Sequence, residues 1–198
     1  MGLNLTYNDG QTPLDEDEKE GLLIRSIATR GELDEFEQQN IEDAIQWSLA
    51  RKFKTEQILS ESFIQQLHIK MYSSVWKWAG EYRKTNKNIG VNKLEITTAL
   101  RSLIDDAKYW LEHSVYEPDE FAIQFKHRLV SIHCFPNGNG RHSRMIADII
   151  IEKKYQLPVF TWGGASLSVD MDIRAQYLKA IRKADKGEFD LLLKFARS

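Results

Sequence analysis

Cysteine is nearly absent from the chain, because Cys134 is the single one among 198 residues. No disulfide can form within such a chain, so we expect a reducing compartment, the cytoplasm, as its location. Long apolar runs are missing too, since the longest, Met145–Ile151, is interrupted by Asp148 and a membrane span needs about 20 apolar residues. We therefore expect no membrane segment. We also expect no secretory signal, because residues 1–11 lack its basic start and apolar run.

An excess of one charge is lacking as well. The chain has 27 Lys and Arg residues against 29 Asp and Glu residues, a formal net charge of −2. This balance indicates no direct binding of nucleic acid, which needs a basic surface. The apolar fraction of 42% and the charged fraction of 28% are typical of a soluble globular protein and argue against a disordered or fibrous one.

Apolar residues at helical spacing fill most of the chain. Pro118 stands where a first-turn proline would begin a helix. Met145–Tyr155 is apolar on nearly all sides, as a central buried helix would be. The pattern predicts an all-α fold. One predicted apolar stripe consists of Phe36, Ile41, Ala44, Ile45 and Leu49.

One segment departs from the helical pattern. Glu81–Val91 has polar turn residues around Asn86–Asn88, with Tyr82 and Ile89 on either side. Apolar arms joined by a polar turn are typical of a β-hairpin. We therefore expect one small two-stranded flap in an otherwise helical protein.

The segment Ile132–Met145 contains the residues that indicate a ligand-binding site. Gly138 and Gly140 would let backbone N–H groups approach a ligand, and a helix beginning there would point its first N–H groups at the same place. Arg141 and Arg144 are three residues apart, so they project from one helix face. Together these features predict a pocket for a chain of phosphates.

His133 precedes this pocket, at the predicted end of the previous helix. Two interpretations of it carry equal weight. A neutral imidazole there would accept a proton from an incoming hydroxyl. Alternatively, the side chain would only cap helix carbonyl groups.

The residues His133–Arg144 resemble the signature of the Fic family, HxFx(D/E)GNGRxxR. Trp78–Arg83 and Asn88–Gly90 are similar to the flap region of that family. Near the start of the chain, Thr12–Asp15 and Thr29–Leu33 resemble the Fic subgroup called mobile mystery protein B.

The resemblance implies a Fic-type helical core over residues 56–198, with closing C-terminal helices, and an N-terminal helical extension over residues 1–55 that is a candidate for regulation. It implies a protein adenylyltransferase, which moves AMP from the co-substrate ATP, with Mg²⁺, to a Ser, Thr or Tyr hydroxyl of a target protein.

The resemblance also implies a role for each site residue. His133 would be the general base. The nucleotide phosphates would contact Gly138, Asn139, Gly140, Arg141 and Arg144. The target would dock by strand addition on the flap residues Lys84, Thr85, Asn86, Lys87, Asn88, Ile89 and Gly90.

Asn137 stands where the family has an acidic residue that binds Mg²⁺. An amide oxygen lacks the charge that a hard cation favours, so Asn137 would be a weak metal ligand. Two alternatives to AMP transfer follow. One is a Fic relative that transfers another phosphate-containing group or the γ-phosphate. The other is a catalytically weak nucleotide-binding module with a partner-protein role.

Many Fic proteins are held inactive by a helix with the pattern (S/T)xxxE(G/N), whose glutamate pairs with the second arginine of the motif. Glu20 followed by Gly21 is a near match, because Glu16 stands where Ser or Thr belongs. Glu20 is thus the candidate inhibitory residue, with Arg144 as its partner. An acidic helix start without an inhibitory role is the alternative interpretation. The subgroup resemblance also implies a toxin–antitoxin-like arrangement with a helix-turn-helix partner.

Overall fold

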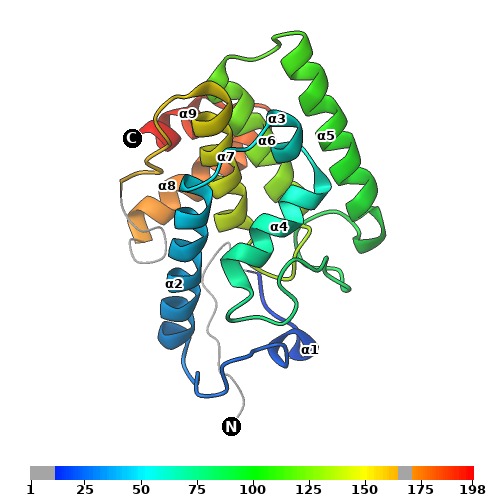
Figure 1. Ribbon diagram of the computed structural model, residues 1–198, viewed down its shortest axis with the longest axis vertical. Helices are drawn as coiled ribbons and strands as arrows, with labels where there is room; N and C mark the ends of the chain where they lie inside the picture. Colours follow the sequence, from blue (N-terminus) through cyan, green and yellow to red (C-terminus); the bar gives the residue numbers. More distant parts are fainter. Residues whose placement is uncertain (1–11, 165–170) are drawn as a thin grey trace.

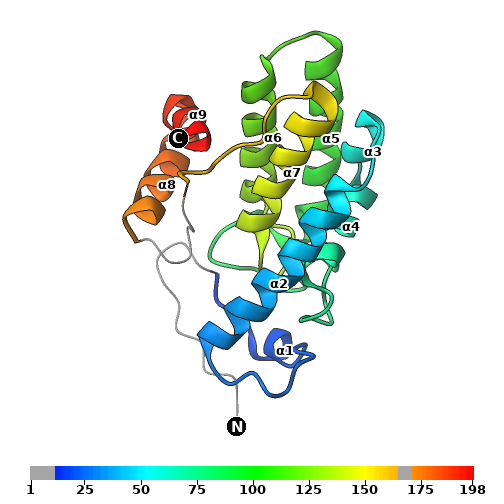
Figure 2. The same cartoon turned by 60° about the vertical axis from the view of Figure 1, so that its left-hand side comes forward.

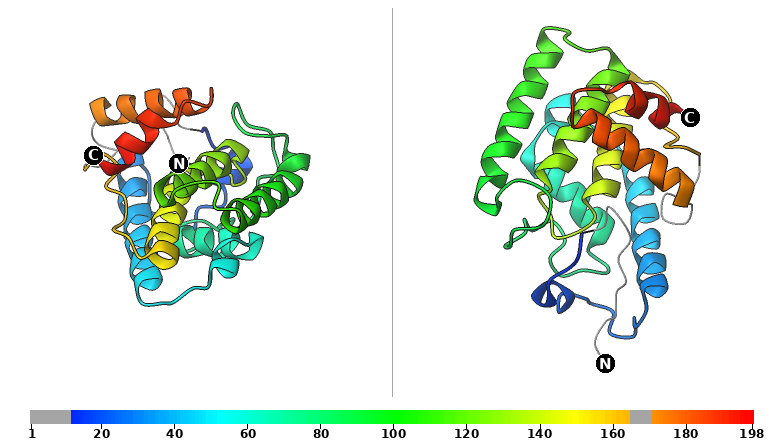
Figure 3. Two further views of the ribbon diagram at one scale, coloured as in Figure 1. Left: turned by 90° about the horizontal axis from the view of Figure 1, so that it is seen from above. Right: turned by 180° about the vertical axis from the view of Figure 1, so that it is seen from behind.

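The two helices that flank the glycine-rich segment lie at the centre of the molecule, surrounded by the others (Figure 3). The computed structural model describes residues 12–164 and 171–198. Its helices confirm the predicted all-α fold. In order they are α1 (Glu16–Lys19), α2 (Arg30–Leu49), α3 (Thr55–Ile58), α4 (Glu61–Tyr72), the 3₁₀ helix η1 (Lys93–Glu95), α5 (Ile96–Glu112), α6 (Pro118–Ile132), α7 (Asn139–Tyr155), α8 (Met171–Ala184) and α9 (Asp190–Arg197).

The central pair, α6 and α7, owes its boundaries to local sequence. Pro118 occupies the first turn of α6, as expected, because its fixed φ suits a helix start and its missing N–H needs no partner there. Gly138 precedes α7 with φ +78°, a conformation that favours glycine. Figure 2 shows α5, α6 and α7 running side by side, while α8 and α9 close the fold at its C-terminal end. The turn between α6 and α7 holds the glycine-rich segment.

The stripe predicted on α2 is only partly correct. Ile41 and Ala44 are buried, whereas Phe36, Ile45 and Leu49 are exposed. The face that packs inward begins at Leu33 and repeats at helical spacing, and three of its members are polar. This buried face consists of Leu33, Glu37, Asn40, Ile41, Ala44 and Ser48.

A polar contact joins α2 to the end of α4. The Asn40 amide donates to the Lys70 carbonyl at 2.9 Å and accepts from the Ser74 N–H at 2.9 Å. Buried polar groups are tolerated when they are hydrogen-bonded in this way. The contact sets the position of α2 beside α4 (Figure 1).

The expected β-hairpin is not formed. Residues 82–91 make a loop, which we call the flap, and the described residues contain no strand besides a single antiparallel bridge between Leu22 and Trp76. The Arg83 side chain replaces cross-strand pairing, because it donates to the Thr85 carbonyl at 2.8 Å and to the Val91 carbonyl. One buried guanidinium thus closes the flap that a backbone ladder would otherwise close.

The chain before α2 packs against the loop that follows α4. Figure 1 places α1 next to the loop that follows α4. The Lys77 N–H donates to the Gly21 carbonyl at 2.8 Å, and the Leu23 N–H donates to the Val75 carbonyl at 2.9 Å. Residues 21–23 are therefore fixed to the loop that follows α4.

Among residues 12–164 and 171–198, no helix has the length and apolar character needed to cross a membrane. The expectation about a secretory signal in residues 1–11 lies outside the described residues. The division at residue 55 stays a prediction.

Candidate active site

His133 ends α6 in a left-handed conformation, with φ 55°. Its carbonyl accepts from Nε of Arg83 at 2.6 Å, and the Cys134 carbonyl accepts from the Arg83 N–H at 2.9 Å. Gly90 passes so close that a Cβ atom there would lie 2.6 Å from Cβ of His133. The flap and the His133 backbone are therefore held together as one unit.

The turn between α6 and α7 is fixed by its own side chains. The Asn139 amide accepts from the Phe135 N–H at 3.0 Å and donates to the Phe135 carbonyl at 2.8 Å. A Cβ on Gly138 would overlap the Tyr72 ring at 2.5 Å, so the backbone meets that ring directly. Phe135 is fully buried and stacks on His68 with ring centroids 3.8 Å apart. The side chain of Asn139 thus shapes the turn, and the first N–H groups of α7 have no acceptor within the helix.

The imidazole of His133 meets a hydroxyl. Its Nε2 lies 3.0 Å from Oγ1 of Thr12, and both residues are buried. Burial, followed by the positive charge of Arg83, lowers the pKa of His133 to about 4. The ring is therefore neutral near pH 7, the state in which a histidine accepts a proton.

The two arginines project from the first turns of α7. Arg141 forms a salt bridge of 2.5 Å with Glu37, whose other oxygen accepts from the Trp76 indole at 2.6 Å. Arg144 lies over the Tyr177 ring, 5.3 Å from its centroid. Although burial alone would raise the pKa of Tyr177, the cations Lys126 and Arg144 bring it below its usual value. The two guanidinium groups thus come from neighbouring turns of α7, and one reaches α2 while the other reaches α8.

Comparison with known proteins identifies this arrangement. The model of the Fic/DOC family matches residues 58–151, from the end of α3 almost to the end of α7. Residues 58–151 form a Fic/DOC domain. The matched residues contain the flap, His133 and both arginines.

Three relatives illustrate the similarity. The curated "Protein adenylyltransferase Fic" of Drosophila grimshawi is 25% identical over 119 residues, which are 59% of this chain and 23% of that protein. The structure of BepC from Bartonella tribocorum with bound AMPPNP gives a TM-score of 0.68 at 16% identity and covers 92% of this chain and 97% of that chain. Fic-1 (residues 134–508) from C. elegans gives a TM-score of 0.61 at 20% identity and covers 80% of this chain and 45% of that one. The chain thus spans about a quarter of the curated adenylyltransferase that it matches.

Asn137, at the acidic position of the Fic signature, turns its side chain onto its own loop. Its Oδ1 accepts from the Gly138 N–H at 2.6 Å, and its carbonyl accepts a hydrogen bond of 3.1 Å from Nε2 of His68. Residues 12–164 and 171–198 contain no group of three or more His, Cys, Asp or Glu side chains arranged to hold a metal. One engaged, neutral amide oxygen does not fit a protein-held Mg²⁺, which prefers carboxylates. Any Mg²⁺ would arrive on the phosphates of a nucleotide, as part of that substrate.

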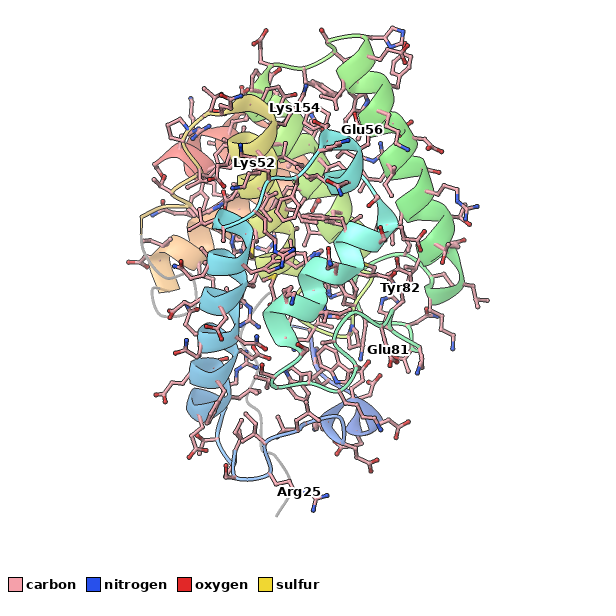
Figure 4. All side chains as sticks on the ribbon, viewed as in Figure 1. Arg25, Lys52, Glu56, Glu81, Tyr82 and Lys154 are labelled. Atoms are coloured by element: carbon pink, nitrogen blue, oxygen red, sulfur yellow. The ribbon has the colours of Figure 1, made fainter. Side chains whose placement is uncertain are left out.

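The flap of this Fic domain is occupied by the segment before α2. Lys87, with a side chain only 4% exposed, bonds Asp15 at 2.9 Å and Glu18 at 2.6 Å. The Thr85 hydroxyl donates to Asp15 at 2.6 Å. The other predicted flap residues that remain exposed to solvent are Lys84, Asn86, Asn88, Ile89 and Gly90. Figure 4 marks Glu81 and Tyr82, where the flap begins between α4 and α1.

Glu20, the inhibitory residue suggested by the sequence, is exposed at the C-terminal cap of α1. The carboxylate that reaches the motif belongs to Glu37, which is 2% exposed. Sequence reasoning missed Glu37 because an acidic residue inside a helix is usually solvated. A signal was present, since Glu37 lies four residues after Leu33 and four before Ile41, in phase with the buried face.

Acidification is expected to leave His133 neutral well below pH 6.5, because burial and Arg83 disfavour the imidazolium. The ring signals of His133 in an NMR titration of the folded chain should therefore not move between about pH 7 and pH 5.5. In the urea-unfolded chain the same ring should titrate near pH 6.5. Unfolded chains then bind protons that folded ones do not, so His133 lowers stability as pH falls from about 6.5 towards 4. A folded-state titration near pH 6.5 would contradict the described burial.

Proposed function

We propose that the chain transfers AMP from ATP to a hydroxyl side chain of a protein. The observation that carries the proposal is the 3.0 Å contact of a buried imidazole with a hydroxyl, beside a helix start that presents two arginines. Family membership supports a transferase of the Fic type. The match to a protein named as an adenylyltransferase and the similarity to a structure with bound AMPPNP favour ATP as the donor.

Each group has a separate task in the proposed reaction. The N–H groups of Gly138, Asn139 and Gly140 would donate to the α- and β-phosphates, helped by the positive end of the α7 dipole. The Gly138 N–H would first leave Oδ1 of Asn137. Arg141 would leave Glu37 to hold the β-phosphate, and Arg144 would hold the γ-phosphate. These contacts would place the α-phosphorus in front of His133.

The chemical step then needs one proton acceptor. His133 takes the acceptor hydroxyl's proton at Nε2 while that oxygen attacks the α-phosphorus. The new O–P bond forms as the bond between the α-phosphorus and its bridging oxygen breaks, and pyrophosphate leaves. The charge that develops on the phosphates is matched by the two guanidinium groups and the helix N-terminus.

The flap is the proposed docking place for a target protein, because it lies next to His133 and its exposed edge carries unpaired backbone groups. A helix-turn-helix antitoxin-like partner and a cytoplasmic location remain part of the proposal. Mg²⁺ enters only with ATP.

Label from α-labelled ATP is expected on protein, and label from γ-labelled ATP is not, because only AMP is transferred. The purified chain, alone and with a soluble protein extract, is incubated with each nucleotide and Mg²⁺, and protein-bound label is measured after denaturing electrophoresis. Label from γ-labelled ATP alone would select transfer of the γ-phosphate instead.

The nucleotide-binding module makes a different prediction for the same assay. It gives thermal stabilisation by ATP without transfer, both in the wild type and in Asn137→Asp. Transfer that is gained in Asn137→Asp would identify a weakened enzyme, because the added carboxylate supplies the charge that Asn137 lacks.

A further inference from the structure

The hydroxyl that contacts His133 comes from this chain's own N-terminal segment. Oγ1 of Thr12 lies 3.0 Å from Nε2 of His133, although 121 positions separate the two residues. Thr12 is 6% exposed and His133 is 6% exposed. The contact is therefore buried within the fold, unlike a contact between two mobile side chains on the surface.

The residues after Thr12 bind the flap. Asp15 accepts from the Thr85 hydroxyl and pairs with Lys87. Glu18 pairs with Lys87 at 2.6 Å, and its carbonyl accepts from the Trp78 indole at 2.9 Å. Acidic residues three and six positions after the hydroxyl thus bring it to the imidazole.

Other hydroxyl groups near the turn are already donating elsewhere. Tyr72 donates to the Gly138 carbonyl at 3.4 Å, and burial raises its pKa to about 12. Ser143 donates to the Gly140 carbonyl at 3.0 Å, and Thr85 donates to Asp15. Thr12 is the hydroxyl in contact with the proposed base.

We propose that Thr12 is an acceptor for the active site of its own chain. The inference rests on the proposed AMP transfer. The Thr12 oxygen attacks the α-phosphorus of ATP, its proton passes to Nε2 of His133, and a phosphodiester to AMP forms as pyrophosphate leaves. The segment Thr12–Glu18 is then both a substrate and the occupant of the flap.

Mass spectrometry after incubation with ATP and Mg²⁺ tests the site. The wild type should gain one AMP group, which peptide fragmentation places on Thr12. Thr12→Val keeps the shape without the hydroxyl and should lose that gain, whereas Thr12→Ser should keep it. Ser26→Ala removes an exposed hydroxyl of the same segment and should label as the wild type does.

A double variant tests the contacts that hold the segment on the flap. Asp15→Asn combined with Glu18→Gln should lower the rate of Thr12 labelling roughly threefold to tenfold, because the pairs with Lys87 are lost.

A mixture of two variants tests whether transfer is intramolecular. Thr12→Val has the base without the acceptor, and His133→Ala has the acceptor without the base. Neither chain should be labelled in the mixture, and label on the His133→Ala chain would overturn transfer within one chain.

The remaining outcomes separate this inference from the proposed function. AMP on another residue or on an extract protein, with Thr12 unlabelled, overturns the inference and leaves the proposed function standing. No AMP on any protein contradicts both.

Discussion

Replacing His133 with alanine is expected to lower the rate of AMP transfer by about 10²- to 10⁴-fold, the usual contribution of a general base. The imidazole is neutral and its Nε2 lies 3.0 Å from a hydroxyl. His133 is therefore already positioned to accept the proton of that hydroxyl. Transfer is measured as the initial rate of labelling from α-labelled ATP. Binding of ATP, measured by calorimetry, should change little, because the proposed phosphate contacts lie on α7.

The left-handed backbone at His133, with φ 55°, requires a second variant. Alanine is strained in that conformation, whereas asparagine adopts it more readily. His133→Asn should fold as the wild type does and still lose transfer. His113→Ala, at an exposed histidine, is the matched control and should transfer at the wild-type rate. If His133→Asn retains the wild-type rate, His133 is only a capping residue.

Replacing Glu37 with glutamine is expected to tighten ATP binding by about tenfold or more. In the wild type, Arg141 must break its salt bridge with Glu37 before it can bind a phosphate, and in the variant there is no salt bridge to break. A hydrogen bond to a charged group contributes about 1.5–3 kcal/mol, and tenfold in affinity is about 1.4 kcal/mol. The amide oxygen of glutamine can still accept from the Trp76 indole. The comparison therefore isolates the charge of Glu37.

The same variant should unfold more easily without nucleotide. Arg141 is left without its partner, and because its side chain is 28% exposed the loss is about 1–3 kcal/mol, less than for a fully buried pair. Urea unfolding with and without ATP measures both effects. Glu35→Gln, on the exposed face of α2, should change neither. Unchanged ATP affinity in Glu37→Gln would mean that Glu37 and phosphate do not compete for Arg141.

The sequence correctly predicted the helices and the turn whose conformation depends only on residues close together in the chain. Pro118 and the largely apolar segment Met145–Tyr155 indicated α6 and α7 correctly. The cluster of Gly138, Gly140 and the arginines indicated the turn, because glycine conformation and helix starts depend on neighbours in the chain.

Contacts between distant segments were not predictable in the same way. The flap was expected to be a hairpin, but the guanidinium of Arg83 satisfies its carbonyls instead. Glu37 contacts Arg141 across 104 positions, and Thr12 contacts His133 across an even longer separation. Such pairs depend on how the helices pack against one another, and a pattern of neighbouring residues does not predict that packing.

The anchoring of residues 12–23 beside the flap has a consequence for any outside protein. Gly21 and Leu23 are bonded to Lys77 and Val75, so the acidic stretch preceding them has an effective concentration on the order of millimolar at the flap. A foreign polypeptide present at about micromolar levels must therefore bind roughly a thousandfold more tightly than this stretch does to take its place. Selectivity would then begin with competition between an outside protein and the N-terminal segment, before any AMP is transferred.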